Sequence, residues 1–406
     1  MLVYLNRNIG PNKSMKNLII TLVFVLIGAL ALLSCKNTEE ATIPQAGIQG
    51  VSVDPKSKES VVTFLSDVYE IKDIYRSMKG PHTTTELRLS DSEEPELIWI
   101  TGFRAEMVGP DGETPMSQEL MCHSNLDIDA KTHNYLFQSK MNPKISRLFT
   151  LSQGQNEIEF PDGFGMPILT PEALKLTTQV LNLNYKKPNI KTRHKITIRY
   201  VRDSDLKKPM IPLMKIFSNS LKRLDESENG YYNLVSADEE RHGEGCLLGE
   251  SAGENIIRDS FERKYTGHWI VKPGREVNTT FVTNMLGVPY DTKVHYIAIH
   301  LHPFAESLEL KDLTTGETVF KSNAKNSEDK IGLDHVDYYS SSEGLPIYKG
   351  HEYQLISSYN NTTDEDHDSM AVIYMYAQDR EFRKPNPSVA NILQVRPSSN
   401  TSEGGM

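Results

Sequence analysis

Two histidines stand two residues apart in a hydrophobic stretch of the C-terminal third of the chain. The stretch IAIHLHPF (297–304) contains His300 and His302. Apolar residues at every other position predict a β-strand, on which residues two apart project from the same face. Two imidazoles on one face can share a metal ion when a neighbouring strand supplies a third ligand, although such pairs also occur on solvated faces.

Met370 is the candidate for the third ligand. It follows the acidic loop TTDEDHDS (362–369) and opens the predicted strand MAVIYMYA (370–377). A thioether suits Cu(I) better than harder ions, so a His, His, Met set indicates copper rather than zinc or iron. The alternative is that Met370 is an ordinary core residue.

The elements that must position these residues are short β-type runs separated by turn residues, with few long amphipathic helical windows. This pattern predicts an all-β fold of two tandem antiparallel β-sandwiches, jelly-roll-like in type. The clearest predicted strands are 96–108, 180–185, 194–202, 268–274, 293–304, 307–320, 352–359 and 370–377.

At 406 residues the chain exceeds one ordinary core, so two main domains are expected. The expected segments are a signal peptide (1–35), a flexible tether (36–60), an N-terminal sandwich (61–203), a C-terminal sandwich (204–382) with a charged insertion (218–266), and a tail (383–406). The formal net charge of −10 argues against nucleic acid as a partner.

The N-terminus has the features of a bacterial lipoprotein signal. Lys16 precedes an uncharged apolar run (18–33), which ends before Ser34 and Cys35. The run is short for a membrane-spanning helix. We therefore expect export and a lipid anchor on Cys35 in the cell envelope, and Lys36 in place of an acidic residue favours the outer membrane.

Two further cysteines, Cys122 and Cys246, remain in the exported chain. An oxidising compartment permits a disulfide between them, but sequence separation does not decide whether they pair.

The C-terminal half resembles the second domain of the copper type II, ascorbate-dependent monooxygenases, the group of peptidylglycine α-hydroxylating monooxygenase and dopamine β-monooxygenase. The matching stretches are WIVKPGREV (269–277), LGVPYDTKVHYIAIHLHPF (286–304), KGHEY (349–353), SSYNNT (357–362) and DSMAVIYMY (368–376). The resemblance implies copper on His300, His302 and Met370, with ascorbate as the external reductant. It also implies a catalytic role for Tyr374, which matches a family tyrosine.

The first half resembles the family's first domain through ELMCHSNLDID (119–129), FPDGFGMPI (160–168) and LKLTTQVLNLNYKKP (174–188). The family holds a second, electron-transfer copper there on three histidines. Only His123 matches, and Asn184 stands at the position of the third histidine, so the resemblance implies a degenerate first copper site.

The family's carboxylate-binding arginine and asparagine are replaced by Ala298 and Val372. A peptide ending in a free glycine carboxylate is therefore not the expected substrate. His295, on the same predicted strand as the histidine pair, is expected to line the pocket or to support a metal ligand rather than to be one.

The preferred interpretation is a copper-dependent monooxygenase-like lipoprotein that hydroxylates a small molecule or peptide not identified by the sequence. Two alternatives remain open. The chain is either a non-enzymatic copper-binding lipoprotein for sequestration or delivery, or a metal-free β-sandwich interaction protein in which the histidines have no ligand.

Overall fold

The computed structural model of the chain describes residues 43–90, 95–139, 146–224, 256–258 and 261–385. The described residues from Pro44 onward form one unit by their contacts. Cys35, Cys246 and the predicted signal peptide lie outside the described residues. Within the described ranges, no helix has the length and apolar character needed to span a membrane.

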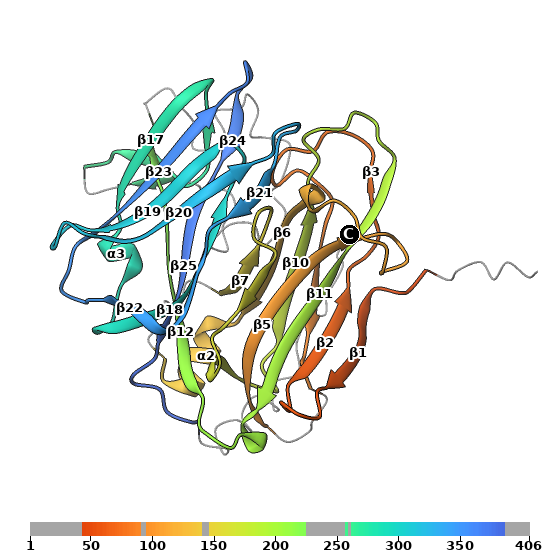
Figure 1. The fold of residues 1–406 in the computed structure, drawn as a ribbon, viewed down its shortest axis with the longest axis vertical. Coiled ribbons are helices and arrows are strands. Elements are labelled where there is room, and N and C mark those ends of the chain that lie inside the picture. The colour runs from red at the N-terminus through yellow and green to blue at the C-terminus, as the bar shows by residue number, and fades with distance from the viewer. Residues whose placement is uncertain (1–42, 91–94, 140–145, 225–255, 259–260, 386–406) are drawn as a thin grey trace, which may run out of the picture. The chain divides into compact units, whose positions relative to one another are not determined.

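The predicted all-β class is confirmed, because strands make up most of the described structure and nearly all of their pairings are antiparallel (Figure 1). We call the strands up to Arg202 the first half and those from Ile211 the second half. The strands of the first half are β1 (Gly47–Val53), β2 (Ser60–Leu65), β3 (Tyr69–Ile71), β4 (His82–Leu87), β5 (Leu97–Val108), β6 (Met121–Ile128), β7 (Arg147–Leu151), β8 (Glu157–Glu159), β9 (Phe164–Leu169), β10 (Leu174–Val180) and β11 (Ile190–Arg202).

The second half contains β12 (Ile211–Asn219), β13 (Lys222–Arg223), β14 (Ile256–Arg258), β15 (Lys264–Thr266), β16 (Trp269–Val271), β17 (Gly274–Phe281), β18 (Thr292–Leu301), β19 (Ala305–Asp312), β20 (Thr318–Asn326), β21 (Leu333–Val336), β22 (Tyr339–Ile347), β23 (Tyr353–Asn361), β24 (His367–Ser369) and β25 (Ala371–Gln378). The helical elements are short: η1 (Gln118–Leu120), α2 (Ala130–Phe137), η2 (Asp203–Asp205) and α3 (Thr283–Leu286).

One long sheet runs through both halves, in the order β1-β2-β11-β5-β9-β12-β25-β18-β22. The halves join in this sheet where β12 pairs parallel with β9, through Ile211 opposite Phe164. In the first half a sheet of order β4-β10-β6-β7 accompanies the long sheet, and in the second half a sheet of order β17-β23-β19-β20-β21 does so.

Parts of the predicted segments differ from the observed elements. Residues 47–53 of the predicted tether form β1, which pairs with β2 although most of its side chains are exposed. Hydrogen bonding to β2, rather than burial, makes this segment a strand, and its glycines obscure the alternation in the sequence. The predicted insertion 218–266 begins inside β12 and contains the small sheet β13-β15-β14.

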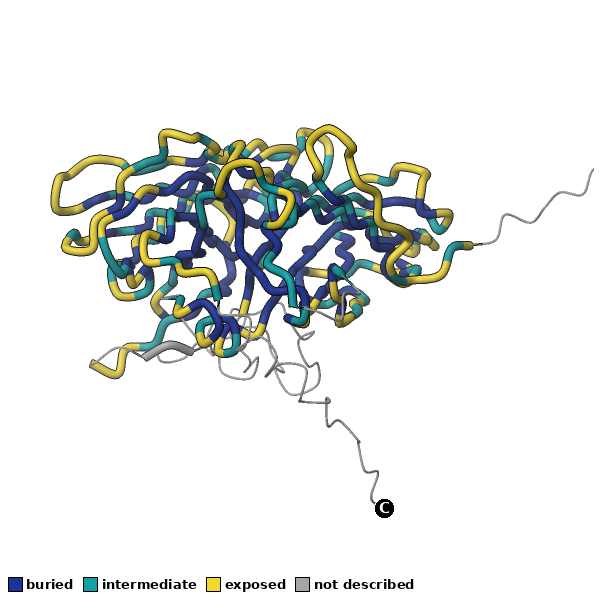
Figure 2. The backbone as a smooth tube through the Cα atoms, turned by 90° about the horizontal axis from the view of Figure 1, so that it is seen from below, coloured by how far each residue is buried: buried dark blue, intermediate teal, exposed yellow. Residues whose placement is uncertain are grey.

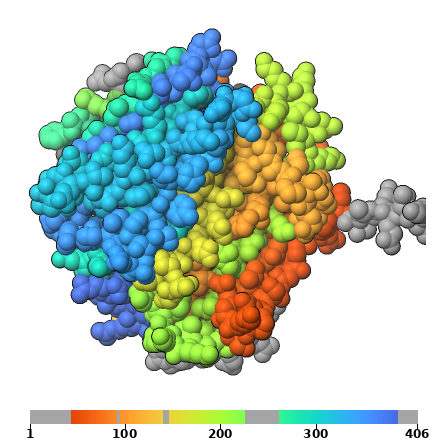
Figure 3. Space-filling model, viewed as in Figure 1, coloured from red at the N-terminus to blue at the C-terminus, as the bar shows by residue number. Residues whose placement is uncertain are grey.

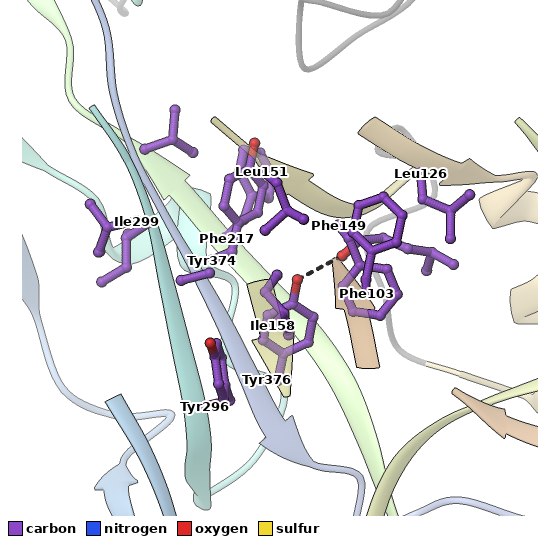
Figure 4. Close-up of a cluster of buried hydrophobic side chains, with 14 of the residues drawn as sticks. Phe103, Leu126, Phe149, Leu151, Ile158, Phe217, Tyr296, Ile299, Tyr374 and Tyr376 are labelled. Carbon is purple, nitrogen blue, oxygen red and sulfur yellow. Dashed lines mark hydrogen bonds between the residues drawn. The ribbon is translucent and has the colours of Figure 1, made fainter. Parts of the chain in front are cut away.

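Buried residues follow the strands of both halves, and exposed residues gather at the connections between strands (Figure 2). A single hydrophobic cluster extends through the two halves. Figure 4 shows Phe103 and Phe149 of the first half close to Tyr374 and Tyr376 of the second. Burial of these large rings stabilises the contact between the halves.

Strand β7 of the first half packs against the second-half part of the long sheet, on strand β25. The phenol of Tyr376 donates to the carbonyl oxygen of Leu148 at 2.8 Å, and its ring stacks on Phe149 with centroids 5.6 Å apart. Two residues further along, Thr150 donates to the phenol oxygen of Tyr374. In the space-filling view, the yellow part of the first half directly contacts the blue second half (Figure 3). The face that carries the histidine pair is therefore covered by the first half.

Candidate functional site

The histidine pair lies at the C-terminal end of β18, as the alternation predicts. His300 is on the strand and His302 directly follows its last residue, Leu301. Both side chains are buried, with exposed fractions of 8% and 7%. Their ring centroids are 5.2 Å apart and the ring planes are nearly perpendicular. The two imidazoles therefore adjoin one another, as residues on one face of a strand should.

The Nδ1 atom of each imidazole has a partner from another part of the chain. His300 Nδ1 lies 3.0 Å from Ser152 Oγ, at the end of β7. His302 Nδ1 lies 3.2 Å from Asp368 Oδ2 on β24. The hydrogen-bond partner of this nitrogen is the main-chain oxygen of Asp368, 3.4 Å away. Carbonyl and carboxylate oxygens only accept hydrogen bonds, so Nδ1 of His302 carries the proton.

The Nε2 atoms of His300 and His302 make no hydrogen bond within the part of the chain that the structure describes. Metal-binding histidines characteristically use one ring nitrogen for the metal and hold the other by a hydrogen bond. The two Nε2 atoms are accordingly the ones that could bind a ligand.

The pKa values of the two imidazoles are shifted in opposite directions. Burial holds the pKa of His300 well below its usual value, and the charges of His302 and His123 add to this effect. Burial also acts to lower the pKa of His302, but the hydrogen bond and charge of Asp368 outweigh it and raise that pKa. In return, the pKa of Asp368 is lowered by His302 in spite of the burial that acts to raise it. His300 is thus a neutral imidazole, and His302 forms a buried pair with a carboxylate.

Met370 lies between β24 and β25 and is buried. Its carbonyl oxygen accepts a hydrogen bond of 2.8 Å from the phenol of Tyr359. The ladder between β18 and β25 pairs His300 with Val372 and Leu301 with Ala371. Continuing it by one residue brings Met370 opposite His302, and opposite residues in an antiparallel ladder share a face. The register thus indicates one sheet face for the three predicted ligands, but Met370 is not among the residues that line the pocket at the histidine pair.

A small pocket adjoins the histidine pair, with about 20 Å³ of space for the centres of water-sized molecules. His300, His302 and Cys122 line it, together with Ser152 and Asp368. Most of the other lining side chains are apolar, and they include Leu181, Leu183, Phe304 and Ile331. No lysine or arginine belongs to its described lining. The lining is therefore largely apolar and without a lysine or arginine, around a space of about the size that a water molecule needs.

Tyr374 does not line this pocket. It shares the sheet face with Met370, but its side chain is only 2% exposed and its phenol oxygen accepts a hydrogen bond of 3.2 Å from Thr150. Burial raises the pKa of this phenol. The position favours a packing role at the junction of the halves over the predicted contact with substrate. The two-residue period of the strand correctly indicates the sheet face on which Tyr374 lies. That β7 packs over this side chain depends on the tertiary structure.

His123 and Asn184, at the predicted first copper site, interact with different parts of the chain. His123 is buried on β6, near enough to lower the pKa values of both His194 and His300. The Asn184 side chain is bonded twice to the main chain of Ile331, through Nδ2 to its oxygen and through Oδ1 from its nitrogen, each at 2.9 Å. Asn184 thus fastens a loop and does not accompany His123.

Among the described residues, no three His, Cys, Asp or Glu side chains come together in a group that could hold a metal ion. The predicted set of two histidines and one methionine is of a different composition. Cys122 is buried and its Sγ lies 3.9 Å from Ser77 Oγ.

Three residues near the pair were not predicted from the sequence: Ser152, Asp368 and His268. Ser152 is 148 positions from its partner His300, so no local pattern relates them. Asp368 is two residues before Met370, and a metal-bound histidine commonly has a carboxylate partner, which is a signal that could have been used. His268 lies just before β16, with its ring centroid 6.1 Å from that of His302.

The expectation that His295 lines the pocket is wrong. Its ring stacks on Phe164 at a centroid distance of 4.2 Å, and its Nδ1 contacts the carbonyl oxygen of Ser341. The spacing from His295 to His300 is odd, which turns the side chain to the other face of a regular strand. The β18–β22 and β18–β25 ladders also shift register at this point, between Val294 and Tyr296.

No protein-family model and no curated protein matches this chain. Several solved structures align with it weakly. The PBCV-1 VP54 structure fitted into a reconstruction of the virophage Sputnik aligns with 82% of this chain and 98% of its own, at 9% identity and a TM-score of 0.29. PNGase F, a glycosylasparaginase from Flavobacterium meningosepticum, aligns over 79% and 96% of the two chains, at 8% identity and a TM-score of 0.29. The STIV MCP structure aligns over 77% and 97%, at 9% identity and a TM-score of 0.25. These values are too low to support a shared function.

Proposed function

We propose that this chain is a copper-dependent oxidoreductase of the monooxygenase type, with a mononuclear site on His300, His302 and Met370. The observation that carries the proposal is the arrangement of the histidine pair. Nδ1 of His300 is next to Ser152 and Nδ1 of His302 is next to Asp368. The Nε2 atom of each ring is left for a ligand. Imidazole and thioether donors together suit copper in its reduced state.

The remainder of the proposal concerns what the chain's own residues do. Ser152 and Asp368 orient the two imidazoles and keep their rings from rotating. Burial keeps His300 neutral, which a metal-binding imidazole must be. A metal ion bound to Nε2 of His302 would leave the proton on Nδ1, which faces Asp368, in place. Bound copper would supply one-electron redox chemistry and a place for oxygen.

The side chains beside the pair favour an uncharged substrate over a carboxylate, and such a substrate requires the small pocket to widen. Its described lining offers apolar side chains and no cation, so a carboxylate would enter without a partner. Hydroxylation (R–H + O2 + 2 H+ + 2 e− → R–OH + H2O) consumes two electrons per turnover, and an external reductant such as ascorbate must supply both. One copper stores only one of them at a time. A lipid on Cys35, outside the described residues, would hold the chain at the cell envelope.

A second candidate function is copper sequestration or delivery without catalysis. Asn184 favours it, because its amide is bonded to Ile331 and does not join His123 in an electron-transfer site. The burial of Tyr374 away from the pocket favours it as well. A metal-free interaction protein is the remaining alternative.

Metal analysis of the full chain, purified in detergent, tests the proposal first. We expect one copper per chain, lost in His300→Ala and Met370→Ala and retained in His351→Ala. His351 is the matched control, since it also forms a pair with an aspartate, Asp312, but is not among the residues lining the pocket. Absence of copper from the wild type would support the metal-free alternative.

Oxygen uptake then separates the enzyme from the carrier. The proposal predicts uptake that requires both copper and ascorbate and that Met370→Ala abolishes. Equal uptake by wild type and Met370→Ala, with copper bound to the wild type, would leave only sequestration or delivery.

A further inference from the structure

A second, larger cavity lies beside the small pocket at the histidine pair. The pocket has about 20 Å³ of space for the centres of water-sized molecules, and both imidazoles on it are buried. The second cavity, which we call the outer cavity, has about 480 Å³ of the same kind of space. Phe304 and Ile331 line both and therefore form a wall between them. A molecule in the outer cavity reaches His300 and His302 only if this wall moves.

The two wall residues are held in different ways. The main-chain nitrogen of Phe304 donates to Asn326 Oδ1 at 2.6 Å, and the Phe304 ring packs on His367 at a centroid distance of 4.6 Å. Ile331 instead belongs to the loop 327–332 between β20 and β21. The ends of this loop are joined by a main-chain hydrogen bond of 3.0 Å. The loop can therefore move about its ends without breaking the strand pairing on either side, and Ile331 is the movable part of the wall.

Side chains of the first half hold the loop against the pocket. The two hydrogen bonds of 2.9 Å between Asn184 and the main chain of Ile331 are the shortest of these contacts. One residue earlier in the loop, Lys330 Nζ lies 3.2 Å from Glu119 Oε2. A segment held by a few polar contacts at its own tip opens locally, at less cost than the unfolding of either sheet. The closed position of the loop thus depends mainly on Asn184 and Glu119.

The outer cavity is acidic. Its described lining carries three carboxylates, on Glu306, Glu328 and Asp329, against the one ammonium of Lys330. Glu328 and Asp329 are exposed, and neither forms an ion pair within the part of the chain that the structure describes. An entrance with an excess of negative charge raises the local concentration of cations and lowers that of anions. The cavity therefore favours uncharged and cationic molecules over anionic ones.

We propose that the loop 327–332 is a gate between the outer cavity and the histidine pair, which admits uncharged or cationic molecules and excludes anions. Release of the loop from Asn184 moves Ile331 out of the wall and joins the two cavities. As a route for a substrate, the gate rests on the proposed function, because it leads to the imidazoles that would hold copper. As a path into the chain it is independent of copper. Cys122 makes this path measurable, since its buried thiol lines the inner pocket.

The first test measures how fast the Cys122 thiol reacts with a small uncharged methanethiosulfonate. The full chain carries Cys35→Ser and Cys246→Ser, so that Cys122 is its only cysteine. Added to this parent chain, Asn184→Ala should speed the reaction about 5- to 150-fold, because it removes the hydrogen bonds that keep the gate closed.

Tyr353→Phe is the matched control. The Tyr353 phenol also makes two hydrogen bonds to the main chain of another residue, Tyr348, at 2.8 and 3.1 Å, and it lines neither cavity. Its replacement lowers the stability of the chain without touching the gate. The rate at Cys122 should then stay within about twofold of the parent chain, because the folded chain reacts through local opening.

The second test compares a cationic with an anionic methanethiosulfonate of similar size, each rate being divided by its rate with a simple thiol in solution. The cationic reagent should react faster with the parent chain. Glu328→Gln combined with Asp329→Asn should lower the ratio of the two rates by about threefold or more at low salt. Unfolding of the whole chain would expose Cys122 without any such dependence on these two side chains.

The outcomes separate the gate from the copper site. An unchanged rate in Asn184→Ala, or an equal increase in Tyr353→Phe, overturns the gate. A ratio that the two carboxylate replacements leave unchanged means that reagents enter by another path, which overturns the role of the outer cavity. Neither readout needs copper, so failure of the metal analysis leaves both unaffected. If Asn184→Ala does not fold, Lys330→Met removes the contact with Glu119 and should likewise speed the reaction with the uncharged reagent.

Discussion

Replacing Lys215 by methionine should stabilise the protein and change how its stability depends on pH. Lys215 lies on β12 at the junction of the two halves, with only 5% of its surface exposed. Its ammonium nitrogen makes no hydrogen bond within the described chain, and it lies 5.8 Å from the centre of the Phe217 ring. The nearby buried carboxylate, Asp127, is already bonded to Arg147 at 2.6 Å.

The pKa of Lys215 gives the size of the effect. Burial, with a smaller contribution from the charge of Arg147, lowers this pKa from 10.5 to about 7, while Asp127 acts in the opposite direction. The difference is about 3.5 units, and one unit corresponds to about 1.4 kcal/mol. The buried ammonium therefore lowers the free energy of unfolding of the wild type by up to about 5 kcal/mol. Lys215→Met should recover most of this amount, less any loss from the packing of the methionine side chain.

The sign follows from proton binding. Below pH 7 the lysine is protonated in both the folded and the unfolded chain, so the reduction is complete and constant. Between pH 7 and 10.5 the unfolded chain binds more protons, and the stability of the wild type rises with pH. From pH 6 to pH 9, the advantage of Lys215→Met over the wild type should shrink by about 3 kcal/mol.

The assay is urea unfolding of both proteins at pH 6, 7, 8 and 9. Lys195→Met is the control, since Lys195 is near the surface and paired with Glu113, and its curves should stay parallel to those of the wild type. An advantage of Lys215→Met that stays constant within about 0.5 kcal/mol over this range would refute the reasoning, because the lysine would then hold its proton in the folded chain.

Three further predictions concern residues around the site. Ser152→Ala should weaken copper binding 10–100-fold and Ser152→Thr should restore it, measured by competition with a Cu(I) chelator, because the hydroxyl holds His300; equal affinities would mean that the hydrogen bond does not orient the ring. Asn184→Ala should lower the free energy of unfolding by about 1–3 kcal/mol, since it leaves the main chain of Ile331 without two partners, and should not change the copper content. Tyr374→Phe should cost about 1 kcal/mol of stability and leave ascorbate-dependent oxygen uptake within a few-fold of wild type, whereas complete loss of uptake would restore a catalytic role for this phenol.

The fold class could be predicted because it depends on short-range patterns. Alternation of apolar residues around His300, and in the strand after Met370, indicates half-buried strands and the face on which each side chain lies. Segment 47–53 was missed for the same reason, since β1 exposes most of its side chains and shows little alternation.

The candidate site was only partly predictable. His300 and His302 are neighbours on one strand, and their period alone brings the rings to the same face. Met370 was placed beside them by resemblance, and the observed register of β18 with β25 agrees with that face. His268 has no such local signal, because its position next to His302 depends on β16 pairing with β24.

The sequence by itself determined the all-β class, the shared face of His300 and His302, and the absence of the histidine from position 184. These are properties of residue type and of a two-residue period. Tertiary structure alone decided that Ser152 would reach His300 and that β7 would cover Tyr374. Both contacts join segments that are far apart in the chain. Strand pairing brings such segments together, and it depends on the packing of the whole sheet rather than on any local pattern.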